Sequence, residues 1–126
     1  MTVLQKASAP DFMANLSTLD GGVPMLQFEG RAEVAAKEVL GAFLRAVDGE
    51  LVQRSASTVT VDFRKLTFMN SSCFKDFVVW LSEVRKRPLA NRYKLRFVSN
   101  PGVRWQRASL STLSTFAVDL VEIVSE

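Results

Sequence analysis

Histidine is absent from this sequence of 126 residues, and cysteine occurs once. Without an imidazole, the chain lacks the commonest general base, the usual catalytic triad and most zinc sites. A single cysteine cannot form an internal disulfide, which is consistent with a reducing compartment. The sequence also contains neither a Walker-type phosphate loop nor a GxGxxG fingerprint. We therefore predict that the chain is not an enzyme and that it binds no cofactor and no metal.

Long apolar runs are missing as well. No stretch approaches the roughly 20 apolar residues that a membrane-spanning helix needs, and residues 1–10 lack the apolar core of a signal peptide. We expect a cytoplasmic protein without a transmembrane segment. The apolar fraction of 48% and the charged fraction of 23% are ordinary for a globular protein. Because a chain of this length buries one hydrophobic core, we predict a single domain over residues 1–126.

The positive charge is small in total but unevenly placed. The formal net charge is +3, yet eight of the 16 basic residues lie between Arg85 and Arg107. No acidic residue lies between Glu83 and Asp119, and Trp105 is among the aromatic residues that interleave with the basic ones. Such a pattern occurs in nucleic-acid-binding proteins, but most charged runs are solvated faces, so we do not expect a nucleic-acid partner. An acidic protein or an anionic membrane surface fits this basic segment better, and whether it binds anything is left open.

Hydrophobic periodicity predicts alternating strands and helices. Val59, Val61 and Phe63 alternate with polar residues, as in a strand with one buried face or nearly two, whereas apolar residues further on recur at helical spacing. The predicted elements are strands at 12–17 and 24–29, a helix from 31 to about 48, a strand at 59–69, a helix from about 71 to 87, a strand at 93–97, a helix from 101 to about 113, and a strand at 116–124.

Turn residues separate these predicted elements. Asp20-Gly21-Gly22 lies between the first two strands, Gly49 and Pro88 are expected to end the first two helices, and Pro101 takes the favoured first position of the third. Strand–helix–strand alternation requires a mostly parallel sheet, because each helix brings the next strand back in the same direction. We predict an α/β fold with a mixed, mostly parallel sheet, an antiparallel amino-terminal edge hairpin, and helices packed on the sheet.

Residues 62–72 read Asp-Phe-Arg-Lys-Leu-Thr-Phe-Met-Asn-Ser-Ser, and this segment resembles the signature of the STAS family, the bacterial anti-sigma-factor antagonists and their relatives. In that family a strand leads into a loop of roughly Thr-Phe-Met/Ile-Asp-Ser-Ser-Gly-Leu and then a helix. Here the loop reads Thr-Phe-Met-Asn-Ser-Ser-Cys-Phe over residues 67–74. The similarity continues on both sides over about residues 26–124. It implies a STAS-like fold and a non-enzymatic module that binds a protein partner.

The resemblance also implies a regulatory site. Ser72, the second serine of the pair, would accept a phosphate, with Ser71 as the alternative. A serine kinase of the anti-sigma-factor type would add the phosphate from ATP, and a phosphatase would remove it. The unphosphorylated protein would bind this kinase or another signalling protein, and the phosphorylated protein would release it. We use the name switch loop for residues Asn70, Ser71, Ser72, Cys73 and Phe74, which would also contact the partner.

Elementary chemistry gives the serines a second interpretation. Asn and Ser side chains accept hydrogen bonds from free backbone N–H groups at the start of a helix, so Ser71 and Ser72 could act as helix caps. The same free N–H groups and the helix dipole favour a phosphate there. Asp62 is either a buried polar residue at the end of the strand or a partner for the backbone of the loop, and we favour the structural role.

Three residues depart from the family pattern: Asn70 replaces Asp, Cys73 replaces Gly, and Phe74 replaces Leu. These departures favour an alternative function, a constitutive subunit or scaffold that docks on a transporter ATPase or a larger signalling assembly without phosphorylation. We interpret Cys73 as a small, partly buried structural residue rather than a redox group. Phe77 is expected in the core, whereas Phe74 and Trp80 are each either core residues or exposed interface anchors.

Overall fold

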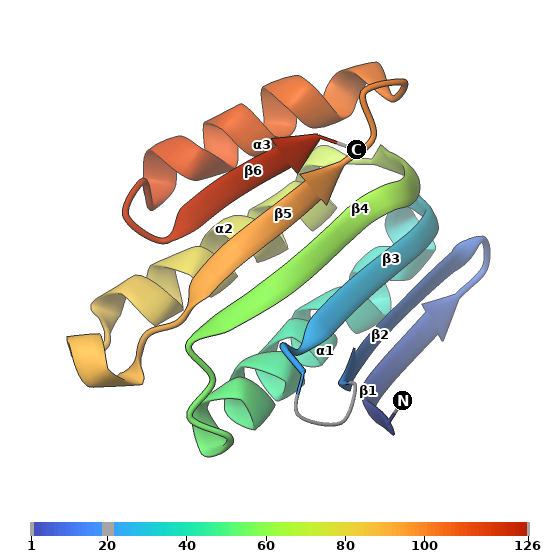
Figure 1. The fold of residues 1–126 in the computed structure, drawn as a ribbon. Helices are drawn as coiled ribbons and strands as arrows, with labels where there is room; N and C mark the ends of the chain where they lie inside the picture. Colours follow the sequence, from blue (N-terminus) through green and yellow to red (C-terminus); the bar gives the residue numbers. More distant parts are fainter. Residues whose placement is uncertain (1, 19–21, 126) are drawn as a thin grey trace.

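The computed structural model describes residues 2–18 and 22–125, which form one six-stranded sheet with helices packed behind it (Figure 1). The strands are β1 (Thr2–Ala9), β2 (Phe12–Thr18), β3 (Met25–Ala32), β4 (Thr58–Met69), β5 (Lys94–Ser99) and β6 (Val121–Ser125). The helices are α1 (Val34–Gln53), α2 (Ser71–Lys86), the short 3-10 helix η1 (Leu89–Asn91) and α3 (Arg104–Phe116). None of the helices in the described part is long and apolar enough to cross a membrane.

The strands lie in the sheet in their order along the chain, and this order explains the two layers. β1 to β3 pair antiparallel, whereas β3 to β6 pair parallel. Each parallel crossover is right-handed in nearly all proteins, so successive crossovers in one direction place α1, α2 and α3 on the same face. Phe28, Phe63 and Phe97 point to that face and are fully buried. The predicted α/β fold with a mixed, mostly parallel sheet is therefore confirmed.

The amino-terminal edge differs from the prediction. The expected hairpin is present as β2 and β3, but β1 pairs with the outer side of β2 and takes the edge position. β1 was missed because an edge strand is mostly exposed and shows little alternation; only Leu4, Ala7 and Ala9 of this strand pack against the core. Of the predicted turn, Asp20 and Gly21 lie outside the described residues.

Gly30 is required where the β1–β2 turn crosses β3. Its φ of +91° lies in the region that L side chains rarely adopt. A Cβ atom at this position would lie 2.0 Å from the carbonyl oxygen of Asp11. That oxygen accepts a hydrogen bond from the Arg31 N–H at 2.7 Å, so the turn cannot move away without losing this bond.

Two helix boundaries also differ from the sequence prediction. α1 continues through Gly49 to Gln53, because the fully buried Leu51 extends its packed face beyond the glycine. Glycine costs a helix only about 1 kcal/mol relative to alanine, which such packing outweighs. α3 begins three residues after Pro101 and runs to Phe116, so the last strand starts at residue 121 rather than 116.

The core contains a buried polar cluster at the carboxyl end of α2. Trp80 is 3% exposed and donates from Nε1 to the Tyr93 hydroxyl at 2.6 Å. That hydroxyl donates to Asp48 Oδ1 at 2.6 Å, and Arg87 pairs with the same carboxylate. Burial, and then the hydrogen bond to Asp48, raise the pKa of Tyr93 well above its usual value. Phe77 is also buried. Phe77 and Trp80 therefore both belong to the core, and Trp80 is not an exposed interface anchor.

Candidate functional site

β4 leads into the switch loop, and the second half of this strand no longer pairs with β5. β4 pairs with β5 only from Thr58 to Asp62, while its pairing with β3 continues to Met69. Two register shifts along β3 each place one extra residue in β4. Such bulges bend a strand and disrupt its ladder. Beyond Asp62, the backbone groups of β4 that face away from β3 therefore need hydrogen-bond partners other than β5.

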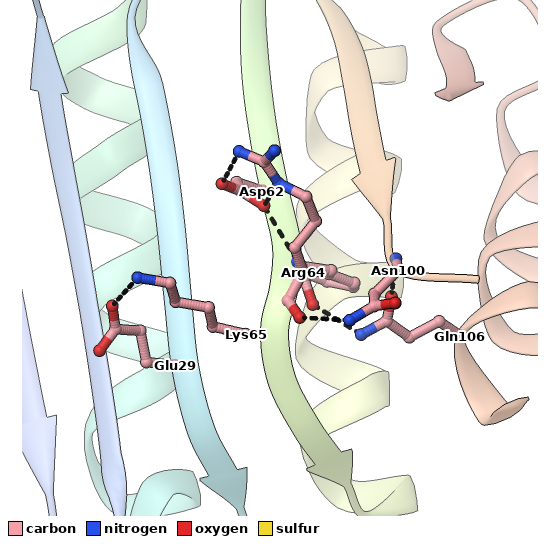
Figure 2. A network of polar contacts seen from close by, with 7 residues as sticks. Glu29, Asp62, Arg64, Lys65, Asn100 and Gln106 are labelled. Carbon is pink, nitrogen blue, oxygen red and sulfur yellow. Dashed lines mark hydrogen bonds and ion pairs between the residues drawn. The ribbon is translucent and has the colours of Figure 1, made fainter. Parts of the chain in front are cut away.

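Gln106 of α3 supplies these partners from a fully buried position (Figure 2). Its Nε2 donates to the carbonyl oxygens of Phe63 at 2.6 Å and Leu66 at 2.8 Å. Its Oε1 accepts from the Asn100 backbone N–H at 2.8 Å. One amide thus fastens β4, the loop after β5 and α3 together. Sequence reasoning missed Gln106, although its position between Val103 and Leu110, at core spacing on a helix, was an available signal.

Three further side-chain hydrogen bonds hold the second half of β4. Trp105 donates from Nε1 to the Thr67 carbonyl oxygen at 2.8 Å, and the Thr67 hydroxyl donates to the Gly30 carbonyl oxygen at 3.0 Å. Asn100 donates from Nδ2 to the Arg64 carbonyl oxygen at 3.3 Å. The strand end that precedes the switch loop is therefore fixed to β3 on one side and to α3 on the other.

Asp62 lies on the face of the sheet opposite the helices, and it is nonetheless buried (Figure 2). Its carboxylate accepts from the Arg64 backbone N–H at 2.9 Å and from the Arg64 guanidinium at 3.0 and 2.9 Å. Burial acts to raise the pKa of Asp62, but the hydrogen bonds and charge of Arg64 outweigh it and hold this pKa below its usual value. The geometry is consistent with the structural role expected for Asp62.

Asn70 begins α2 as its N-cap. Its Oδ1 accepts from the Cys73 N–H at 2.8 Å, and its own N–H donates to the Ala32 carbonyl oxygen at 2.9 Å. Ser71 and Ser72 are exposed, and neither hydroxyl has a hydrogen-bond partner within the described residues. The interpretation of the two serines as helix caps is therefore wrong, because the preceding amide performs that role and leaves both hydroxyls free.

A lysine from α1 anchors the backbone of the switch loop. Lys37 donates from Nζ to the Ser72 carbonyl oxygen at 3.1 Å and to Asp76 Oδ1 at 2.9 Å. Asp76 is largely buried, and its Oδ2 has no hydrogen-bond partner in the part of the chain that the structure describes. The ammonium group thus compensates a buried carboxylate one helical turn after Ser72. Lys75, on the exposed side of the same turn, forms no ion pair with the described residues.

Cys73 is fully buried beneath the loop. Its Sγ lies 3.6 Å from the Glu33 carbonyl oxygen. Burial is the main cause that raises the pKa of the thiol, the charge of Asp76 raises it further, and Lys37 lowers it. A protonated, inaccessible thiol is a poor nucleophile. The structure therefore agrees with a packing role for Cys73, whose side chain does not reach the exposed surface of the switch loop.

A groove of about 350 Å³ lies beside Ser71, between the start of α2 and the exposed side of α3. Phe74, which is partly buried, forms one wall. The lining residues are Met69, Asn70, Ser71, Phe74, Ala108, Ser109 and Thr112. Four of the five residues of the switch loop thus lie at the surface, and an apolar groove adjoins them.

Comparisons with known proteins reveal a shared fold. No protein-family model matches the sequence, and no curated protein matches it. Among solved structures, the crystal structure of an anti-sigma factor antagonist from Mycobacterium paratuberculosis matches with a TM-score of 0.61 and 17% sequence identity. The match covers 94% of this chain and 90% of that chain. The STAS-like fold implied by residues 62–72 is therefore confirmed: this chain has the fold of an anti-sigma factor antagonist.

Proposed function

We propose that this protein is a cytoplasmic, non-enzymatic switch module that binds a protein partner and is controlled by phosphorylation of Ser72. One observation carries the proposal. Asn70 alone satisfies the helix cap, so Ser71 and Ser72 present free, exposed hydroxyls at the start of α2. The fold shared with an anti-sigma factor antagonist supports it.

Phosphorylation at Ser72 would change the charge of the surface without unfolding the helix. A kinase would transfer the γ-phosphoryl group of ATP to the Ser72 oxygen, with release of ADP and loss of the hydroxyl proton. The product carries nearly two negative charges, which the amino end of α2 stabilises. Lys75 stands three residues further along α2, within reach of a phosphate at this position. The cap and the buried Cys73 stay in place, because neither depends on the Ser72 side chain.

The same change would control partner binding. In the unphosphorylated state, Ser71, Ser72 and the groove beside Phe74 offer a largely uncharged surface. A partner such as a serine kinase of the anti-sigma-factor type would desolvate this surface at little cost. Burying a dianionic phosphoserine in the same interface is costly even beside Lys75, because one ammonium group compensates only part of the charge, so the phosphorylated protein would be released.

The first test is the intact mass of the protein isolated from its own cells, together with that of two variants. We expect one added phosphate in the wild type, its loss in Ser72→Ala, and its retention in Ser71→Ala. The second variant is a matched control, because both serines are exposed and neither caps the helix. A phosphate that persists in Ser72→Ala and disappears in Ser71→Ala would move the site to Ser71. An unmodified mass under every growth condition would contradict the switch.

A second test measures binding to the partner recovered from those cells. Ser72→Ala should bind as tightly as the unphosphorylated wild type, and Ser72→Glu should bind more weakly, because it adds a charge at the contact. Ser71→Glu controls for charge at the adjacent position. Equal binding of Ser72→Ala and Ser72→Glu would refute phosphorylation control even if the protein were phosphorylated.

Two observations favour a second candidate function, a constitutive subunit that docks on a transporter ATPase or a larger signalling assembly. Cys73 packs tightly where the STAS signature has glycine, and the Asp76 carboxylate stands one turn from Ser72, where it would repel a phosphate. This alternative predicts one tight partner whose binding is the same with and without ATP. Dissociation of that partner on addition of ATP would refute it.

A further inference from the structure

The structure resolves the basic segment into paired and unpaired charges. Five of its eight basic residues form ion pairs with carboxylates from other parts of the chain: Arg85 and Arg92 with Asp119, Lys86 with Glu83, Arg87 with Asp48, and Arg96 with Glu122. The segment as a whole is therefore not a free cationic surface. Lys94, Arg104 and Arg107 remain, and none of their side chains has a hydrogen-bond or ion-pair partner within residues 2–18 and 22–125.

Arg104 and Arg107 line the same cavity, which we call the Arg104–Arg107 pocket. It has a volume of about 530 Å³, and residues from the first turns of α3 and from the carboxyl ends of β5 and β6 line it. These ends of the three elements lie at the same edge of the molecule (Figure 1). Besides the two arginines, its lining residues are Ser99, Asn100, Pro101, Val103, Ser111, Ile123 and Ser125. A volume of this size suits a small-molecule ligand.

The two walls of the pocket follow from the periodicities of helix and strand. Arg104, Arg107 and Ser111 are spaced three and four residues apart, so they share one face of α3. Ser99 and Ser125 are paired neighbours on parallel strands, and their hydroxyl oxygens lie 3.2 Å apart. The helix wall is thus cationic and the sheet wall carries hydroxyl groups.

No carboxylate lines the pocket in the described part of the chain. Glu122, on the same strand as Ser125, is exposed and pairs with Arg96 instead. Two like charges at i and i+3 on a helix repel each other, and none of the described lining residues is an acid that relieves the repulsion between Arg104 and Arg107. An anion bound between the two guanidinium groups would relieve it.

We propose that the Arg104–Arg107 pocket binds a phosphate group, carried by a small soluble molecule or by a lipid headgroup. Guanidinium groups match the oxygen geometry of a phosphate. On the opposite wall the buried Ser99 hydroxyl already donates to the Val124 carbonyl oxygen, so the exposed Ser125 hydroxyl is the one that can turn toward a ligand. In sheets with parallel strands, ligands commonly bind at the carboxyl ends of the strands, where this pocket lies. α3 also begins at Arg104 without a side-chain cap, so its free N–H groups add positive potential beside the two arginines. The proposal is independent of phosphorylation at Ser72.

The test for a soluble phosphate is a titration of the full chain with inorganic pyrophosphate and with inorganic phosphate, followed by amide NMR shifts at constant ionic strength. We expect saturable shifts at residues 99–107 and 125. Arg104→Gln and Arg107→Gln should each weaken binding by about tenfold or more, the typical effect of removing a charge-assisted hydrogen bond. Arg45→Gln is the matched control: it removes one guanidinium that is also exposed and without an ion pair among the described residues, but lies on α1.

The test for a lipid headgroup is co-sedimentation with phosphatidylcholine vesicles that contain phosphatidic acid. Saturable binding of pyrophosphate without vesicle binding would identify a soluble ligand. Vesicle binding that pyrophosphate displaces would identify a lipid headgroup. Either result supports the pocket if Arg104→Gln and Arg107→Gln abolish or weaken the binding. The proposal is overturned if neither probe binds, or if Arg45→Gln weakens binding as much as the pocket variants. Because the three arginine side chains have no hydrogen-bond or ion-pair partner among the described residues, unchanged circular dichroism should show that all three variants remain folded.

Discussion

Replacement of Gln106 by leucine tests how the end of β4 is held. The substitution keeps the size of the side chain but leaves three backbone groups without their partner: the carbonyl oxygens of Phe63 and Leu66 and the N–H of Asn100. Each buried, unsatisfied polar group costs about 1–3 kcal/mol, so we expect a loss of at least about 3 kcal/mol in the free energy of unfolding. This is a large part of the total stability of a small domain, which is about 5–15 kcal/mol.

Urea unfolding followed by tryptophan fluorescence measures this loss. With a slope near 2 kcal/mol per molar urea, about 3 kcal/mol lowers the midpoint by about 1.5 M without a change of slope. Gln53→Leu is the control, because Gln53 is an exposed residue at the end of α1 and should stay within about 0.5 kcal/mol of the wild type. A loss below about 1 kcal/mol in Gln106→Leu would refute the role given to this amide.

Gln106→Glu separates the donor from the packing of the side chain. A carboxylate can still accept from the Asn100 N–H, but it faces the Phe63 and Leu66 carbonyl oxygens without a proton to donate. Burial beside these oxygens favours the protonated form, so the folded-state pKa of the new residue should exceed its unfolded value near 4.3. The free energy of unfolding of Gln106→Glu should therefore approach that of the wild type as the pH falls toward about 4.3, and fall further below it as the pH rises through the folded-state pKa. A deficit that does not change with pH would contradict this account.

Four further substitutions or measurements test single contacts. Asn70→Ala should cost about 1 kcal/mol in urea unfolding through loss of the α2 cap, whereas Asn70→Asp should match or exceed the wild type, because a carboxylate also accepts the bond and favours the helix dipole. Tyr93, the only tyrosine, should stay protonated in the folded protein above pH ~10 and ionise on unfolding, which ultraviolet absorbance of tyrosinate measures. The stability that its hydroxyl contributes below pH ~10 should therefore be lost as the pH rises further. The Cys73 thiol should react with an aromatic disulfide reagent far more slowly in the folded protein than in urea, because it is buried and its pKa is raised. Gly30→Ala should lower stability by about 2 kcal/mol or more, because its Cβ meets the Asp11 backbone at a positive φ, and full stability in thermal unfolding would disprove the clash.

Much of the sheet and the position of the switch loop could be predicted from the sequence. The alternation of Val59, Val61 and Phe63 revealed the buried face of β4, and this signal is strong because the side of the strand that meets the helices is fully buried and apolar while polar residues occupy the other side. The helical spacing after Asn70 placed the start of α2 within one residue. These signals are local, so a single segment of sequence contains them.

The features that sequence reasoning missed depend on contacts between distant segments. β1 has weak alternation of its own and exists as a strand because β2 offers it an edge. The role of Gln106 depends on the bulges where β4 leaves β5, in a segment of the chain far from α3, and its amide bonds reach back 43 and 40 residues. The serine caps were predicted wrongly for a related reason: several residues near a helix start can cap it, and the contact of the Asn70 N–H with Ala32 selects the one that does.

The parallel direction of β4, β5 and β6 explains why both candidate sites lie at the same edge of the molecule. Parallel strands end at one edge, and the segments that follow β4 and β5 each begin a helix there. Each of those helices exposes its positive amino end, α2 beside Ser72 and α3 beside Arg104. The two sites differ because Asn70 caps α2 and leaves hydroxyl groups to be modified, whereas α3 has no side-chain cap and carries arginines instead. On the two proposals above, a phosphate is added covalently at the first site and bound reversibly at the second, with the buried Gln106 network fixed between them.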